Sequence, residues 1–173
     1  TDLSDPASDL DLMMPAGDQV ARAMGAAGVG DGCRVVLYDS QMNMWSARVW
    51  WMLRTIGVEA SILDGGWAAW TSEGRPAASG PGEIPTPAVF TPGAPLDAVE
   101  DKLGVRAAIG DPRVCVVDAL EPEVYSGDRQ DYARRGHIPG AVNIPFASLV
   151  DPATHRYLPL PELEALVRPT AAS

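Results

Sequence analysis

The chain has 173 residues, of which 46% are hydrophobic and 21% are charged. Its 13 lysines and arginines are outnumbered by 23 aspartates and glutamates, which gives a formal net charge of -10 at pH 7. Because an acidic surface repels phosphate backbones, this balance argues against nucleic-acid binding. No apolar run reaches membrane-spanning length and no basic, then apolar, segment opens the chain, so we expect no membrane partner.

The chain has few side chains suited to metal ions or disulfides. Its two cysteines, Cys33 and Cys115, lie too far apart in sequence for a metal-binding pair and are too few for a disulfide framework. We interpret both as reduced thiols of a cytoplasmic protein. The two histidines, His137 and His155, are too few to indicate a metal site. The sequence therefore predicts neither a metal nor another cofactor.

Strands and helices alternate in the first part of the chain. The run from Arg34 to Tyr38 is short, apolar and rich in β-branched residues, which is typical of a buried parallel strand. Apolar side chains at i, i+4, i+7, i+8 and i+11 predict a helix that begins near Trp45 and ends before Gly57. In chain order we expect a helix at 18–27, a strand at 34–38, a loop at 39–43, a helix at 45–56, a strand at 60–63 and a short helix at 66–73.

The composition changes at about residue 75, where proline, glycine, alanine, serine and threonine replace periodic apolar residues. This predicts an extended surface linker over residues 76–95. Strands again alternate with helices beyond it, so the sequence favours an α/β fold with parallel sheets flanked by helices. We expect a helix at 96–103, a buried strand at 114–117, a polar segment at 121–135, a strand at 142–144 and a helix from 161.

Two short stretches carry a resemblance to a known family. Residues 63–70 read Leu-Asp-Gly-Gly-Trp-Ala-Ala-Trp, and residues 136–141 read Gly-His-Ile-Pro-Gly-Ala. Each resembles a signature of the rhodanese-type sulfurtransferases, and in two-domain members of that family the two belong to successive domains. Their order, with a proline-rich linker between them, supports the resemblance more than either stretch alone.

The resemblance implies two rhodanese-like domains, both incomplete in this chain. Residues 1–75 resemble the later part of an N-terminal, non-catalytic domain, and residues 96–173 the early part of a C-terminal, catalytic domain. In this family a loop after a strand holds the cysteine that carries sulfur. We therefore expect the nucleophilic cysteine to lie beyond Ser173, and sulfurtransferase activity in the chain itself to be close to zero.

At the end of the first expected strand the chain has Asp39, as the non-catalytic domains of two-domain rhodaneses do. A carboxylate cannot carry sulfane sulfur, so we interpret Asp39 as a degenerate site whose side chain accepts hydrogen bonds in the loop or at the helix N-terminus. Such a loop is a cradle of backbone N–H groups that lowers a thiol pKa and holds an anion. Neither cysteine fits the catalytic role, because Cys33 precedes its strand and Cys115 lies inside an apolar one.

Basic residues near the second signature are candidate substrate contacts. Many family members carry an arginine two residues after the aspartate that ends the first strand of the catalytic domain, and here that position is Leu120. Arg129, Arg134 and Arg135 could supply positive potential instead. His137 is either a hydrogen-bonded structural residue of its turn or part of the pocket rim. Without the usual arginine, thiosulfate is favoured over 3-mercaptopyruvate, whose carboxylate prefers a bidentate partner.

Two functions fit these residues, and a third does not. The resemblance implies a sulfurtransferase that moves sulfane sulfur from thiosulfate or 3-mercaptopyruvate, through a cysteine persulfide, to cyanide or a thiol. The alternative is a non-catalytic rhodanese-like binding or regulatory module, which Asp39 favours. The related dual-specificity phosphatases use a Cys-x5-Arg loop, and nothing here matches it, because Asp39 stands at its start and Arg48 lies further along, in the helix.

Overall fold

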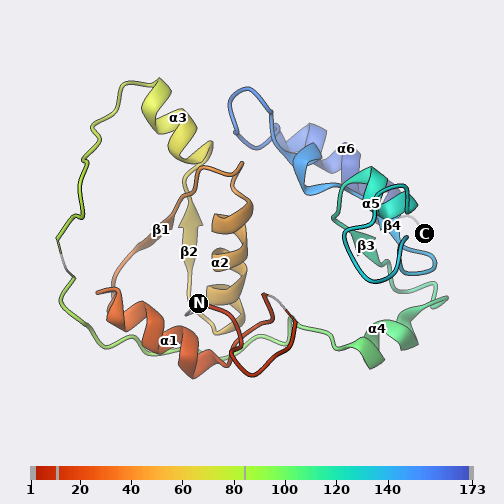
Figure 1. The fold of residues 1–173 in the computed structure, drawn as a ribbon, viewed down its shortest axis with the longest axis horizontal. Helices are drawn as coiled ribbons and strands as arrows, with labels where there is room; N and C mark the ends of the chain where they lie inside the picture. The colour runs from red at the N-terminus through yellow and green to blue at the C-terminus, as the bar shows by residue number, and fades with distance from the viewer. Residues whose placement is uncertain (1–2, 11, 84, 172–173) are drawn as a thin grey trace. The chain divides into compact units, whose positions relative to one another are not determined.

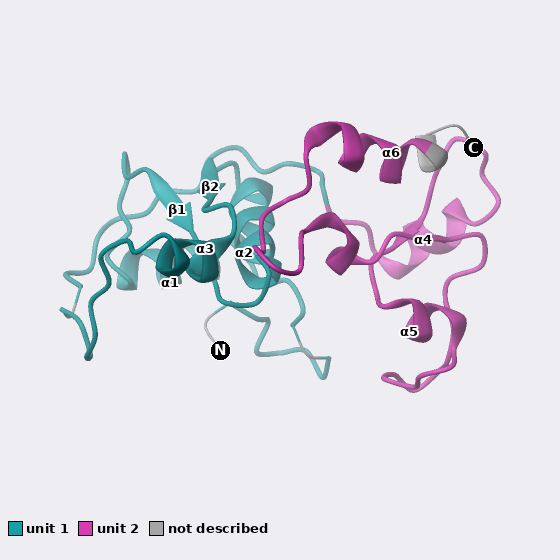
Figure 2. Ribbon diagram, turned by 90° about the horizontal axis from the view of Figure 1, so that it is seen from above, with its two compact units in different colours: residues 1–98 teal, residues 99–173 magenta. Residues whose placement is uncertain are grey.

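Two short parallel sheets, one in each half of the chain, organise the computed structural model of this protein (Figure 1). The structure describes residues 3–10, 12–83 and 85–171. The chain divides into two units, Thr1–Ala98 and Val99–Ser173, which Figure 2 colours separately. The fold is α/β, as the alternation of strands and helices predicts. The assignment of residues 1–75 and 96–173 to parts of two larger domains stays a prediction.

The first unit follows the predicted order of elements closely. Strands β1 and β2 pair in parallel, with Val36 opposite Ser61, and helix α2 connects them. A helical connection is what parallel strands require, since a tight turn cannot join them. The elements are helix α1 (Gly17–Ala26), strand β1 (Val35–Leu37), helix α2 (Met44–Thr55), strand β2 (Ala60–Ile62) and helix α3 (Gly66–Ser72).

The core of the first unit lies where α1 and α2 meet one face of this sheet. Val20 of α1 and Met52 and Leu53 of α2 are fully buried there. Side chains alternate along a strand, so β1 turns Val35 and Leu37 toward this core while Val36 faces away and is 48% exposed. In the described residues the sheet therefore has one covered face and one open face.

The second unit is built around strands β3 and β4, which pair in parallel with Val117 opposite Val142. Its buried apolar side chains are those of Val124, Ala141 and Val150. The elements are helix α4 (Lys102–Ala108), strand β3 (Val117–Asp118), helix α5 (Pro122–Ser126), strand β4 (Val142–Asn143), a 3-10 helix (Phe146–Leu149) and helix α6 (Leu160–Ala171).

The helix predicted at 96–103 is wrong in its position. Helix α4 begins at Lys102 because the carboxylate of Asp101 accepts the backbone N–H groups of Leu103 and Gly104, which is N-capping. The residues before it continue the extended linker, and the N–H of Leu96 donates to the carbonyl of Thr55. The capping side chain, rather than the apolar spacing, sets the start of this helix.

The buried strand predicted at 114–117 is also wrong. Strand β3 covers only Val117–Asp118, and Val114, Cys115 and Val117 are all exposed. In the described residues β3 pairs with β4 alone, so it has no second neighbouring strand to help bury these side chains. The prediction that Cys115 lies inside this strand is wrong as well, since Cys115 precedes β3 and is exposed.

The polar segment at 121–135 contains a helix that the sequence analysis missed. Helix α5 starts with Pro122, whose fixed φ angle suits the first helical turn, and ends at Ser126, just before Gly127, whose φ is +87°. Pro122 and Gly127 were the sequence features from which this helix could have been predicted. The proline-rich residues 76–95 form no helix or strand where they are described, as predicted, and Ile84 within them lies outside the described residues.

Candidate functional site

Strand β1 runs directly into a loop that closes around the side chain of Asp39. The carboxylate accepts three backbone hydrogen bonds, from Gln41 at 2.6 Å and Asn43 at 3.1 Å on Oδ1 and from Ser46 at 2.7 Å on Oδ2. The backbone of Met42 and Asn43 is left-handed, with φ of 53° and 64°, which turns the chain back toward the carboxylate. Ser46 lies in the first turn of α2, so Asp39 caps that helix from the strand before it.

The charge state of Asp39 follows from two opposed effects. Its half-burial disfavours the charged form, but the hydrogen bonds from Ser46, Gln41 and Asn43 together outweigh burial and hold the pKa of the carboxyl below its ordinary value. The side chain is therefore an anion at neutral pH. Backbone N–H groups at the start of a helix are suited to an anion, and here the protein supplies that anion itself.

The Leu-Asp-Gly-Gly-Trp signature packs onto the backbone of this loop. The N–H of Trp67 donates to the carbonyl of Asp39 at 2.9 Å. Gly65 and Gly66 have φ of 80° and 51°, and a Cβ atom on Gly66 would lie only 2.5 Å from the Asp39 carbonyl oxygen. Both glycines are thus explained by geometry: they allow the turn into α3 and its close approach to residue 39.

Neither cysteine lies at the end of a strand where Asp39 does. Cys33 precedes β1 and Cys115 precedes β3, and both are exposed free thiols. In open parallel sheets, ligands bind beyond the carboxyl ends of the strands. Those ends carry Asp39 in the first unit and Asp118 in the second. Both thiols therefore lie at the opposite edge of their sheet from the expected reaction site.

The Gly-His-Ile-Pro-Gly-Ala turn is fastened to helix α5. His137 Nδ1 lies 2.8 Å from the carbonyl oxygen of Tyr125, and the two rings stack with centroids 3.7 Å apart. Since a carbonyl only accepts, Nδ1 carries the proton in this contact. The Tyr125 hydroxyl in turn donates to the carbonyl of Ala141 at 2.7 Å. These contacts fit the structural role predicted for His137, and its place at the pocket rim stays a prediction.

The three arginines predicted to contact substrate share the loop between α5 and β4. Asp131 pairs with Arg129 at 3.0 Å and raises the pKa of its guanidinium, and Arg135 donates to the side chain of Gln130 and to two loop carbonyls. Arg134 alone of the three has no acceptor among the described residues. This loop leads into the amino end of β4. Substrate binding by the three arginines stays a prediction.

Sequence reasoning missed Asn143, which joins the carboxyl ends of the two strands in the second unit. Its Nδ2 donates to the carbonyls of Asp118 at 3.1 Å and Leu120 at 2.8 Å. Asp118 Oδ1 also accepts the N–H of Leu120 at 2.9 Å, which fixes the first turn after β3. An asparagine inside a predicted strand was the available signal, since asparagine is depleted in strands.

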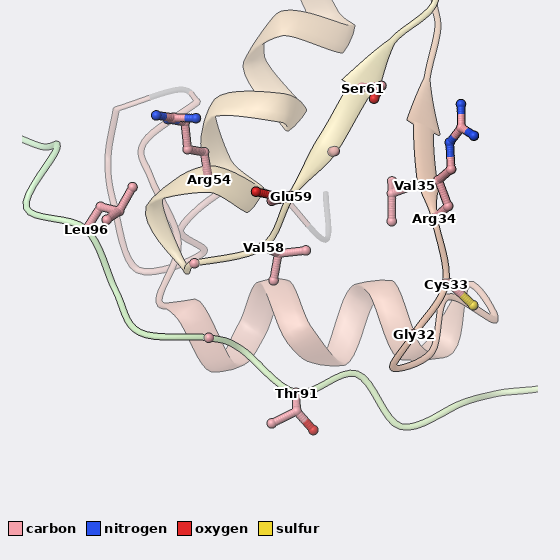
Figure 3. A pocket seen from close by; sticks show the side chains of 13 residues that line it. Gly32, Cys33, Arg34, Val35, Arg54, Val58, Glu59, Ser61, Thr91 and Leu96 are labelled. Atoms are coloured by element: carbon pink, nitrogen blue, oxygen red, sulfur yellow. The ribbon is translucent and has the colours of Figure 1, made fainter.

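Two hollows lie in the first unit, away from the Asp39 carboxylate. One, of about 970 Å³, opens at the amino ends of β1 and β2, and Figure 3 shows Arg34, Arg54 and Glu59 around it. The other, of about 440 Å³, lies on the open face of the sheet, beside Tyr38 and Trp67. Across residues 3–10, 12–83 and 85–171, no three histidine, cysteine or acidic side chains gather as a metal site. Nor does any helix in those ranges have the length and apolarity needed to cross a bilayer.

Comparisons with known proteins agree with the two signatures. Residues 11–73 match the family model of the Rhodanese-like domain. The chain is 35% identical over 157 residues to the thiosulfate sulfurtransferase of Gallus gallus, covering 87% of this chain and 53% of that protein. It is 38% identical over 155 residues to the 3-mercaptopyruvate sulfurtransferase of Homo sapiens, covering 85% of this chain and 51% of that protein.

A solved structure extends this similarity to the fold. The crystal structure of the 3-mercaptopyruvate sulfotransferase SseA from Escherichia coli matches with a TM-score of 0.84 and 34% identity, over 99% of this chain and 64% of that one. The chain spans about half the length of the curated relatives it matches. Its two signatures, its α/β architecture and these similarities together mean that the chain belongs to the rhodanese family.

Proposed function

We propose that this chain is part of a sulfurtransferase that takes sulfane sulfur from thiosulfate or 3-mercaptopyruvate and passes it to cyanide or a thiol. The nucleophile of the complete protein would be a cysteine outside residues 1–173. The printed names of the relatives, thiosulfate and 3-mercaptopyruvate sulfurtransferase, support these two donors. The partners are therefore small molecules, and the reaction needs no cofactor.

The proposed reaction has two steps that share a covalent intermediate. A cysteine thiolate attacks the outer sulfur of thiosulfate, a new S–S bond forms, the S–S bond of thiosulfate breaks, and sulfite leaves with the electron pair. Cyanide or a thiolate then attacks the outer sulfur of the persulfide, which releases the cysteine thiolate. With 3-mercaptopyruvate the bond that breaks is C–S, and pyruvate leaves after its carbon takes up a proton.

The geometry around Asp39 is the main support for a nucleophile outside residues 1–173. Its carboxylate holds the three N–H groups that would otherwise stabilise a thiolate or persulfide, and it has no sulfur to transfer. Cys33 and Cys115 lie before their strands. We therefore infer that the first unit supports the reaction without performing it.

Thiocyanate production tests this proposal directly. We expect the complete protein to convert thiosulfate and cyanide to thiocyanate, and residues 1–173 alone to show no rate above background. The double variant Cys33→Ser, Cys115→Ser of the complete protein should keep its full rate, because neither thiol is the nucleophile. Substantial activity in the isolated chain, lost in the double variant, would overturn the assignment.

Arg134 is the best candidate among the predicted substrate contacts, because its guanidinium is not held by a neighbour in the described residues. In the complete protein, Arg134→Gln should raise the KM for thiosulfate about tenfold with kcat unchanged, the loss of one charge-assisted hydrogen bond. Arg129→Gln is the matched control, since Asp131 already holds that side chain. An unchanged KM in Arg134→Gln would leave the loop with a structural role only.

The second candidate function is a non-catalytic rhodanese-like binding module. The geometry around Asp39 favours this function too, since the Asp39 carboxylate itself occupies the backbone N–H groups of the loop that follows β1. A complete protein that forms a stable complex with a partner and produces no thiocyanate or pyruvate from either donor would favour this function over sulfur transfer.

A further inference from the structure

The second half of the proline-rich segment is hydrogen-bonded to the first unit, although its composition predicts an extended surface linker. Its residues 88–96 run past the end of α1, the loop before β1 and the end of α2 (Figure 3). Backbone hydrogen bonds hold it at all three places: Ala88 N–H to Gly25 O at 2.9 Å, Asp31 N–H to Val89 O at 2.9 Å, Gly93 N–H to Ile56 O at 2.8 Å and Leu96 N–H to Thr55 O at 2.9 Å.

One carboxylate adds a two-point attachment in the middle of this segment. Asp31 accepts the backbone N–H of Thr91 on Oδ1 at 2.7 Å and the Thr91 hydroxyl on Oδ2 at 2.8 Å. The two residues are 60 positions apart in sequence, so this contact closes a long loop of chain. Both oxygens of the carboxylate are used, which fixes the orientation of Thr91 as well as its position.

Three glycines let the backbones meet at contact distance. A Cβ atom would lie 2.5 Å from Ala88 O if added to Gly25, 2.3 Å from Ala94 O if added to Gly57, and 2.4 Å from Gly57 O if added to Gly93. Side chains at these positions would push the segment away. Gly80 and Gly82, earlier in the linker, differ, since nothing lies within 4 Å of a Cβ built on either of them.

We propose that residues 88–96 are a strap belonging to the first unit, latched by the Asp31–Thr91 contact, and that the latch sets the length of the connection between the two units. With the latch closed, residues 97–101 are what remains between the strap and the N-terminus of α4. With the latch open and the backbone hydrogen bonds of the strap released, residues 88–96 are added to that connection. Because the reach of a flexible connection grows with its length, the latch is a conformational control on the second unit. This inference does not depend on the proposed sulfurtransferase activity.

Amide hydrogen exchange of residues 1–173 tests the strap. In the wild-type chain, the amides of Thr91, Gly93 and Leu96 should exchange at least about tenfold more slowly than those of residues 77–80. In Asp31→Ala, Thr91 and its strap neighbours should exchange about tenfold faster, while the α2 amides of Met52 and Leu53 keep their protection. Asp97→Asn is the control, because it removes an equal charge next to the strap and its carboxylate has no hydrogen bond among the described residues.

Each other outcome counts against the latch. Strap amides that exchange as fast as residues 77–80 in the wild type would show that the segment is a plain linker. A similar effect from Asp31→Ala and Asp97→Asn would show that charge, not the contact with Thr91, matters. If the α2 amides also lose protection in Asp31→Ala, the test passes to Thr91→Val, which keeps the shape of the side chain and removes only its hydroxyl. Strap amides that exchange in Thr91→Val at the wild-type rate would contradict the proposal.

Discussion

Replacing Asp39 with alanine should lower the free energy of unfolding of the chain by about 3 kcal/mol. The substitution removes the shared acceptor of three backbone N–H groups, and each lost hydrogen bond costs roughly 1 kcal/mol. Urea unfolding followed by tryptophan fluorescence measures this, since Trp45 lies next to the loop and Trp67 donates to it. Asp97→Asn, at an exposed position, is the control and should change the midpoint little.

The same carboxylate should give the chain a stability that depends on pH. The pKa of Asp39 is lower in the folded chain than in the unfolded one. Its contribution is therefore present above the unfolded-state pKa of about 4, and is lost as pH falls through the lower folded-state pKa. Asp39→Asn should flatten that part of the curve. A wild-type curve and an Asp39→Asn curve that run parallel below pH 5 would contradict the assigned role.

Replacing Gly66 with alanine should cost a similar amount, about 3 kcal/mol. The added Cβ would meet the Asp39 carbonyl oxygen at 2.5 Å, and the residue must keep a left-handed φ of 51°. Relief of the clash requires α3 to move away from the loop, which breaks the hydrogen bond from Trp67. The same urea titration measures the loss.

Gly74→Ala separates the two causes of that loss. Gly74 also has a left-handed φ, of 67°, but nothing lies within 4 Å of a Cβ built there. This variant should therefore lose only the backbone preference, about 1 kcal/mol. Equal losses at the two positions would mean that the close approach to Asp39 does not matter, and that the second glycine of the signature serves the turn alone.

The first unit could be predicted from sequence because its local patterns agree with its packing. Val35 and Leu37 alternate with Val36 as a strand requires. Met52 and Leu53 of the predicted apolar stripe are buried at the core, although Trp45 at its start is 41% exposed. The position of Asp39 at a strand end could be read in the same way. Its role as a hydrogen-bond acceptor in the loop or at the helix start was predicted too, and the structure confirms it. The identity of its three donors was not, because it depends on the left-handed turn at residues 42 and 43.

The second unit was predicted less well because its elements are short and depend on single residues. Helix α4 starts where Asp101 caps it, and α5 where Pro122 begins its first turn, and neither cause is periodic. An apolar run such as residues 114–117 indicates burial only when other elements cover it. The strap was missed for a related reason: composition describes a linker, whereas its attachment depends on distant partners such as Gly25 and Gly57.

The two cysteines have a practical consequence that is independent of sulfur chemistry. Cys33 belongs to the first unit and Cys115 to the second, each stands shortly before the first strand of its sheet, and both are exposed and free. The native chain thus carries one thiol-reactive position on each unit. A pair of fluorescent dyes attached there would report the distance between the units without any added mutation, and so would read directly whether Asp31 and Thr91 hold the connection short.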